Sequence, residues 1–362
     1  MSGGILGLEG ATILSGGVLH VLSLGWVSGT ILSSGAVDYV ISGGMAVGDI
    51  VLGGATDATQ AGGTNMSALD SGGAMPVSAG GLILSATLVS HGNERISSGG
   101  QDNGTVISSG GSATVLSSGT AVGETVSSGG VMIVSSGGVA MGVDVLSGGA
   151  ATVLSGGAFA GAVSGGTVVI SAGGVLNGGL TISAGTVTVS GAVSGHIVDF
   201  AGSSGDLVLA NLSAFTADIL GMSNASQTVD LVGFAYNSAT ETVSWSQTPG
   251  AISSGTLTVT DGAQVANLTL IGTYATSNFV LTNDGHGGTF VADPPSGGVV
   301  LTLADTMTGV ANFAQAISLF DTASGGANEG GGGSPYTTNS GGNLLGVAPL
   351  IPTGTTSAMG HG

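Results

Sequence analysis

The residues of this chain that could do acid–base chemistry are few and widely spaced. Arg95 is the only Lys or Arg, against 20 Asp and Glu, which gives a formal net charge of −19. Glycosidic cleavage needs two carboxyl groups that flank one bond. Eight acids of the repeats are instead spread along them; some could stack one coil apart, but we expect most of them to be solvated loop residues. They are Asp38, Asp49, Asp57, Asp70, Glu94, Asp102, Glu124 and Asp144.

Arg95 is the only side chain that could act as the basic residue of a polysaccharide lyase. It stands in the segment His91-Gly-Asn-Glu94-Arg95, near an irregularity in the glycine spacing. Because an acid directly precedes it and no second base is present, we expect a loop ion pair there. The sequence therefore predicts no catalytic residues.

The sequence also predicts no metal and no cofactor. The five His, at 20, 91, 196, 286 and 361, have no metal-ligand spacing, and the chain contains no Cys. The segment Asp284-Gly-His286-Gly-Gly resembles one calcium-binding nonapeptide but occurs once, so we expect an Asx-type turn. Nucleic acid is excluded as a partner because phosphate contacts need clustered Lys and Arg.

Hydroxyl groups are the most frequent reactive groups of the first half. Ser stands beside Gly at nearly every glycine cluster, as in Thr105-Val-Ile-Ser-Ser-Gly-Gly and Thr152-Val-Leu-Ser-Gly-Gly. At chain corners such Ser would form columns along an outer edge. They could accept covalent groups there, or they could simply satisfy backbone groups of the turns.

The elements that carry these Ser are short strands. The chain is 42% hydrophobic despite its 73 Gly, so it can form a core, whereas disordered chains lack apolar surface. Its apolar runs are about four to six residues long, too short for a transmembrane helix. Val and Thr fit pleated strands, and Gly reaches positive φ at the corners that follow.

Glycine spacing defines a repeat of about 19 residues. Gly16 to Gly35, Gly53 to Gly72 and Gly110 to Gly129 are steps of this length, and each contains two glycine clusters. We therefore expect two strands per unit. Units of this size bury their apolar faces only by stacking. Stacked hairpins are an alternative, but the period matches one turn of a parallel β-helix.

The fold class predicted is all-β: a right-handed parallel β-helix, or solenoid, with an atypical β-rich C-terminal cap and a flexible tail. Seven of the eight Phe lie beyond His196, which indicates a bulkier core there. The expected domains are the repeat β-helix over 1–195, β-rich terminal coils or cap over 196–300, a short helical segment over 301–321 and a flexible Gly/Ser/Pro-rich tail over 322–362.

The paired Ser-Gly-Gly units over residues 12–195 resemble the strand-loop-strand repeats of AIDA-type autotransporter passenger domains. Two stretches carry the resemblance, Val126–Ala140 and Val145–Ala158. The resemblance implies a non-enzymatic adhesin on the Gram-negative cell surface or secreted from it. It also implies O-linked heptose, a heptosyltransferase partner, and candidate glycan acceptors at Ser117, Ser118, Ser127, Ser128, Ser135 and Ser136.

The expected partners are a host or neighbouring-cell surface, extracellular matrix or polysaccharide, with no membrane insertion by this chain. Met1–Ile5 shows no signal-peptide pattern, and no closing series of amphipathic membrane strands is evident. We therefore expect either another export route, as in type I secretion, or a fragment of a longer protein. The alternative functions are a secreted β-helix enzyme acting on polysaccharide and a trimeric phage-type fibre.

Overall fold

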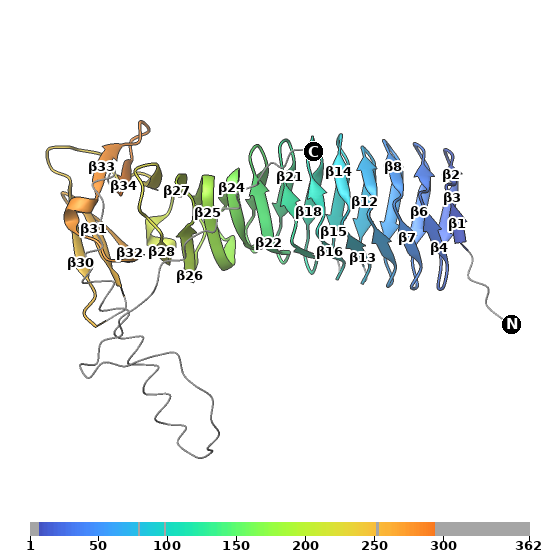
Figure 1. The fold of residues 1–362 in the computed structure, drawn as a ribbon, viewed down its shortest axis with the longest axis horizontal. Coiled ribbons are helices and arrows are strands. Elements are labelled where there is room, and N and C mark those ends of the chain that lie inside the picture. The colour runs from blue at the N-terminus through green and yellow to red at the C-terminus, as the bar shows by residue number, and fades with distance from the viewer. Residues whose placement is uncertain (1–6, 79, 98, 251–252, 294–362) are drawn as a thin grey trace, which may run out of the picture. The chain divides into compact units, whose positions relative to one another are not determined.

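The computed structural model describes residues 7–293 apart from 79, 98, 251 and 252. The predicted helical segment 301–321 and the tail 322–362 lie outside the described residues. Within them, a parallel β-solenoid of about twelve coils runs from β1 to β29 (Figure 1). The predicted parallel β-helix is confirmed, and stacked hairpins are excluded over this range because its strands pair in parallel.

Each of the first seven coils contains three strands, each paired with its equivalent in the next coil. The first strands are β1 (Gly7–Glu9), β4 (Trp26–Ser28), β7 (Met45–Val47), β10 (Thr64–Met66), β13 (Leu82–Leu84), β16 (Gln101–Asn103) and β19 (Thr120–Val122). The second strands are β2 (Thr12–Ile13), β5 (Ile31–Leu32), β8 (Ile50–Leu52), β11 (Leu69–Ser71), β14 (Thr87–Val89), β17 (Val106–Ile107) and β20 (Thr125–Val126). The third strands are β3 (Val18–Val21), β6 (Val37–Val40), β9 (Thr56–Thr59), β12 (Ala74–Val77), β15 (Asn93–Ile96), β18 (Ser112–Val115) and β21 (Val131–Val134).

The glycine repeat is thus one coil, but the expected pair of strands per unit is wrong. The register joins Val115 to Val134 and Val134 to Val153, so each valine repeats once per coil. The additional corner, between the first and second strands, turns at a single residue of positive φ, such as Gly29 (63°) or Ser67 (55°). One residue per corner leaves no glycine pair to mark it in the sequence.

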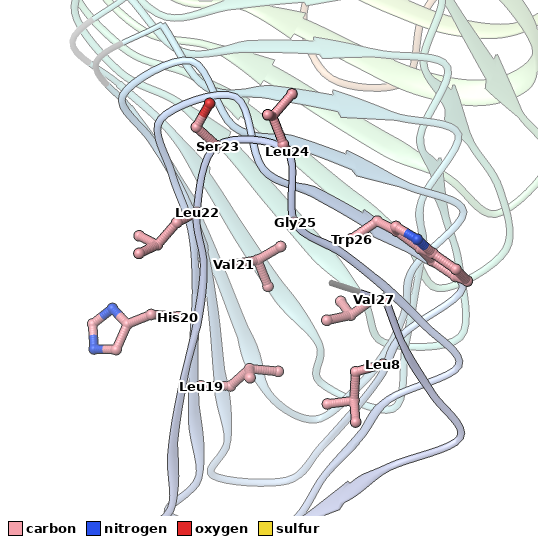
Figure 2. Close-up of a pocket in the computed structure, with 11 residues that line it drawn as sticks. Leu8, Leu19, His20, Val21, Leu22, Ser23, Leu24, Gly25, Trp26 and Val27 are labelled. Atoms are coloured by element: carbon pink, nitrogen blue, oxygen red, sulfur yellow. The ribbon is translucent and has the colours of Figure 1, made fainter. Parts of the chain in front are cut away.

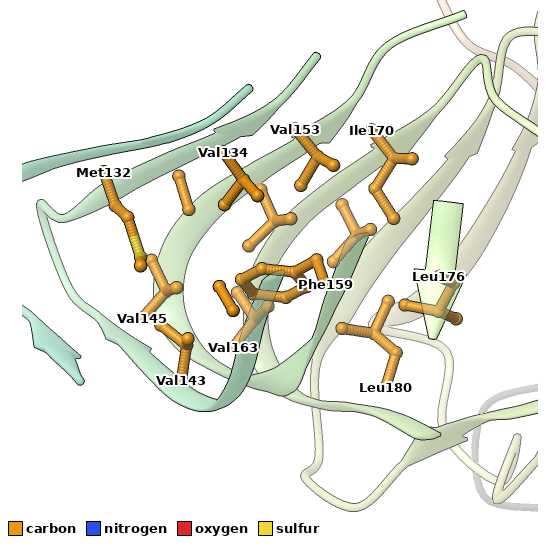
Figure 3. Packing of buried hydrophobic residues seen from close by; sticks show 14 of the residues in the cluster. Met132, Val134, Val143, Val145, Val153, Phe159, Val163, Ile170, Leu176 and Leu180 are labelled. Carbon is orange, nitrogen blue, oxygen red and sulfur yellow. The ribbon is translucent and has the colours of Figure 1, made fainter. Parts of the chain in front are cut away.

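The strands lengthen and fuse in the later coils. They are β22 (Val139–Leu146), β23 (Ala150–Val153), β24 (Ala158–Ile170), β25 (Val175–Val189), β26 (Val193–Phe200), β27 (Gly205–Leu209), β28 (Phe215–Leu220) and β29 (Gln227–Leu231), with the 3₁₀ turn η1 (Leu212–Ala214). Between Val139 and Val189 the buried side chains are all apolar, and Figure 3 shows Phe159 surrounded by Val145, Val163 and Leu180.

Antiparallel strands follow the last coil. They are β30 (Thr242–Gln247), β31 (Ser254–Asp261), β32 (Gln264–Ile271), β33 (Val280–Asn283) and β34 (Thr289–Ala292), with the 3₁₀ turn η2 (Thr276–Asn278). β32 pairs with β28 in parallel and β34 pairs with β29 in antiparallel fashion. These pairings cover two strand edges of the final coil, which would otherwise offer free backbone groups to other chains.

Candidate functional site

Serines at two corners of the solenoid form the most regular polar feature of its surface. At the corner after the second strands, Ser109, Ser128 and Ser147 occupy equivalent positions in successive coils and are exposed. At the corner after the third strands, Ser117 and Ser136 are equivalent and exposed. Because stacked strands lie about 4.8 Å apart, each corner repeats its hydroxyls at that spacing along the stack.

Glycine makes the stacking of these serines possible. A Cβ built on Gly156 would stand 2.6 Å from the Oγ of Ser136, and one built on Gly148 would stand 3.0 Å from the Oγ of Ser128. Both glycines also have positive φ, 76° and 75°. Close packing of corner on corner therefore favours the Ser-Gly-Gly sequence, and so does the backbone conformation.

The six predicted acceptors divide into two groups by exposure. Ser117, Ser118, Ser128 and Ser136 are exposed, whereas Ser127 and Ser135 are half-buried. The Oγ of Ser127 also lies 3.5 Å from the carbonyl oxygen of Ile107, to which it can donate a hydrogen bond. Of the six predicted acceptors, the first four are therefore open to a modifying enzyme.

The expectation that most of the eight repeat acids are solvated loop residues is wrong. Seven of the eight face the interior of the solenoid and are at most 1% exposed: Asp38, Asp49, Asp57, Asp70, Glu94, Asp102 and Glu124. Asp144 alone is exposed. A signal was present in the alternation of the strands. Asp38 lies two residues before the buried Val40, so both point to the same side of β6.

The expected loop ion pair of Glu94 and Arg95 is also wrong. Both residues lie on the strand β15, where Glu94 points inward and Arg95 is exposed. The two oxygens of the Glu94 carboxyl have no hydrogen-bond partner in the structure. Adjacent strand residues face opposite sides of a sheet, so this pair cannot form a site on one surface.

The expected turn at Asp284 is confirmed. The Oδ1 of Asp284 accepts hydrogen bonds from the backbone N–H groups of His286 (2.6 Å) and Gly288 (2.8 Å). Although desolvation opposes them, these hydrogen bonds hold the pKa of Asp284 below its usual range. Among the described residues, no group of three or more His, Asp and Glu side chains is arranged to hold a metal ion.

A pocket of about 310 Å³ lies at the first two coils and is mainly apolar. Figure 2 shows Leu8, Val21 and Val27 around it, with the ring of His20 pointing away from Val21. A second pocket, of about 230 Å³, is lined by Tyr236, Glu241 and three other residues. Neither pocket is lined by a pair of carboxyl groups.

The repeat sequence has recognisable relatives. A family model described as the adhesin of the bacterial autotransporter system, probable stalk, matches residues 98–149. A solved structure, of a TibC-catalysed, hyper-glycosylated fragment of TibA, is 30% identical in sequence. The alignment covers 62% of this chain and 84% of the fragment, with a TM-score of 0.48. The chain belongs to the AIDA-type autotransporter adhesins. No curated protein matches it in sequence.

Membership of the AIDA-type adhesins gives the solenoid its role as a passenger repeat region that is secreted or exposed at the cell surface. The matched residues 98–149 cover the corners of Ser109, Ser117, Ser128 and Ser136. Among the residues that the structure describes, no helix is long and apolar enough to cross a bilayer.

Proposed function

We propose that this chain is a non-enzymatic adhesin stalk displayed at the outer face of a Gram-negative cell, with O-glycans on its corner serines. The observation that carries the proposal is the regular repetition of exposed hydroxyls at two corners of a stacked solenoid. Repetition at the coil spacing allows many identical weak contacts to act together on a host or neighbouring cell surface, on matrix or on polysaccharide.

The set Ser117, Ser118, Ser128 and Ser136 is the proposed acceptor site, and a heptosyltransferase is the proposed partner. Two features support it: these side chains are exposed, and the sequence-related TibA fragment is hyper-glycosylated through TibC. Ser118 occupies the place that Gly137 takes one coil later and has a φ of 63°. Its hydroxyl therefore projects from a tight corner where a transferase can reach it.

The alternative of a polysaccharide-acting enzyme loses its candidate residues in this structure. Seven acids that could have formed a catalytic pair lie inside the solenoid, where a polymer cannot reach them. The eighth, Asp144, stands alone on the surface among the repeat acids. An enzyme of this class needs two carboxyl groups in one accessible groove.

Surface display is tested by treating intact producing cells with a protease. Loss of the full-length chain while a cytoplasmic control survives, or recovery of the chain in the medium, is the expected result. A chain that stays protected inside the cell would contradict the adhesin proposal.

Glycan attachment is tested by producing the full chain with and without a bacterial heptosyltransferase and mapping modified residues by mass spectrometry. We expect heptose on the exposed four serines, and a variant with alanine at all four should lose the heptose that maps to these serines at the two corners of coils six and seven. The matched control replaces the half-buried Ser127 and Ser135 and should lose little. Modification confined to other residues would overturn the site assignment.

A further inference from the structure

The interior of coils two to seven holds a column of carboxyl groups. Asp38 on β6 pairs directly with Asp57 on β9 of the next coil. Asp49, Asp70, Glu94, Asp102 and Glu124 follow along the same lumen, and each of the seven is at most 1% exposed. The other titratable side chains of these strands, Tyr39 and Arg95, alternate to the outer side. No described cation therefore faces the column.

Some of these carboxyl oxygens are satisfied by donors. Asp70 accepts from the backbone N–H groups of Gly73 (2.6 Å) and Asn93 (2.8 Å). Asp49 accepts from the N–H of Thr30 at 2.9 Å. Asp102 accepts from the hydroxyl of Thr105 at 2.8 Å. One oxygen of Asp57 likewise accepts from the side-chain amide of Asn65. Asp49, Asp70 and Asp102 are suited to carry a negative charge or to receive a further hydrogen bond.

The remaining polar atoms of the lumen are almost all acceptors without donors. Both oxygens of Asp38, Glu94 and Glu124 lack partners, as do one oxygen each of Asp49, Asp57, Asp102 and the Asn65 amide. Only the hydroxyls of Thr30 and Thr59 among these unpartnered lumen groups could donate. Buried acceptors without donors are costly, so a group that supplies positive charge or hydrogen would stabilise this interior.

A proton fits this interior better than a metal ion does. A hard cation of the calcium type needs six to eight converging oxygens. The described residues contain no set of three or more carboxyl and imidazole groups with such an arrangement. A proton, in contrast, converts each carboxyl into a donor for a neighbouring carboxyl or amide oxygen, and it removes the charge that burial penalises.

We propose that Asp38, Asp57, Glu94 and Glu124 are protonated carboxylic acids in the folded solenoid, hydrogen-bonded along the lumen, so that acid stabilises these coils and alkali loosens them. Glu94 and Glu124 donate to Asp102 between them, and Asp38 and Asp57, which stand in register on stacked coils, donate one to the other along the stack. This proton site is separate from the adhesin function and does not depend on it.

The direction of the pH effect follows from burial. Desolvation, with a smaller contribution from the neighbouring Asp102, raises the pKa of Glu124 to about 10. Desolvation and Asp49 raise the pKa of Asp38 to about 7. Desolvation followed by neighbouring acids raises the pKa of Asp57 and of Glu94 well above their usual values.

Unfolded carboxyls lose their protons near pH 4, whereas these folded ones keep them to higher pH. Between the pKa of the unfolded carboxyl and that of the folded one, the folded state therefore binds more protons. The free energy of unfolding falls as pH rises through this range. For each carboxyl still protonated in the folded state, the unfolding equilibrium constant rises about tenfold per pH unit.

The test is thermal unfolding of the full chain, monitored by circular dichroism between pH 4 and pH 10, in one series without and one series with a metal chelator. We expect the unfolding midpoint to be highest near pH 4 to 5 and to fall continuously toward pH 10. The double variant Glu94→Gln, Glu124→Gln carries neutral side chains and should show a flatter profile. The matched control Asp144→Asn, which removes an exposed acid, should keep the wild-type profile.

Two results would overturn the proton site. One is a midpoint that is constant or rises between pH 5 and pH 9. The other is a midpoint that drops on chelation at fixed pH and recovers with calcium, since that would place cations in the lumen. If the double variant fails to fold, the profile of the wild-type chain still decides between these results.

Discussion

Coils two to seven, over residues 26–134, and coils eight to ten, over residues 139–189, share one backbone plan. They differ in the side chains that fill them. The earlier coils bury seven carboxyl groups along with Thr30, Thr59, Asn65 and Thr105. From Val139 to Val189, every buried residue is apolar or Gly. The ladder of parallel strands passes from one region to the other without a break. Coil stacking is thus set by the corners and the strand ladder, and it tolerates two different interiors.

The largest effect should come from placing an acid in the apolar region. Val163 is fully buried and pairs with Val145 and Ile182 in the adjacent coils. Val163→Asp has no acidic neighbour with which to share a proton, and we expect a loss of about 4 kcal/mol in the free energy of unfolding at pH 7. Titration with denaturant measures this loss. A loss below about 1 kcal/mol would show that any coil of this solenoid accepts an acid.

Removing the large side chain of the apolar region should cost nearly as much. Phe159 is fully buried among aliphatic side chains, as Figure 3 shows. Phe159→Ala leaves a cavity, and we expect a loss of about 3–5 kcal/mol by the same titration. Leu154→Ala, at a position that is 41% exposed, is the control and should cost far less. Equal losses would contradict the packing described for this coil.

Replacing a corner glycine should destabilise the two regions equally. A Cβ on Gly111 would lie 2.3 Å from the carbonyl oxygen of Leu88, and one on Gly149 would lie 2.3 Å from that of Val126. We expect Gly111→Ala and Gly149→Ala each to lower the free energy of unfolding by about 1–3 kcal/mol because the corner must shift. Paired chemical denaturation curves compare them. If one variant folds normally and the other does not fold at all, corner geometry depends on what fills the coil and not only on the corner itself.

The smallest effect should be a gain from replacing an acid by an apolar side chain of similar size. Glu94→Met removes two oxygens without donors, and we expect the chain to become more stable by about 1 kcal/mol at pH 8 and less so at pH 5. Thermal unfolding at both pH values measures the change. Destabilisation at pH 8 would show that the Glu94 carboxyl stabilises the lumen in its ionised form.

Much of the fold could be predicted from the sequence because glycine pairs mark two of the three corners. The spacing from Gly110 to Gly129 predicted the coil length, and Val-rich runs predicted the strands. The third strand was missed because its corner needs only one residue of positive φ, such as Gly29. The exposed Ser117 and Ser136, proposed as glycan acceptors, could be placed at corners from the same pattern.

The buried acids could not be predicted by residue type, since ionisable side chains are seldom fully buried. Their positions were visible only in strand parity. Glu94 stands two residues before the buried Ile96, as Asp38 does before Val40. Because donors to these acids come from adjacent coils, as Thr30 donates to Asp49 and Asn93 donates to Asp70, composition alone could not reveal which acids would be buried.

The protonation of the lumen can be read directly from the infrared spectrum of the folded full chain at neutral pH. Protonated carboxylic acids have a C=O stretching band separate from those of carboxylates. We expect this band in the wild-type chain and in Asp144→Asn, and we expect it to weaken in the Glu94→Gln, Glu124→Gln variant and to vanish on unfolding. A folded wild-type chain that shows carboxylate bands alone would contradict a protonated interior.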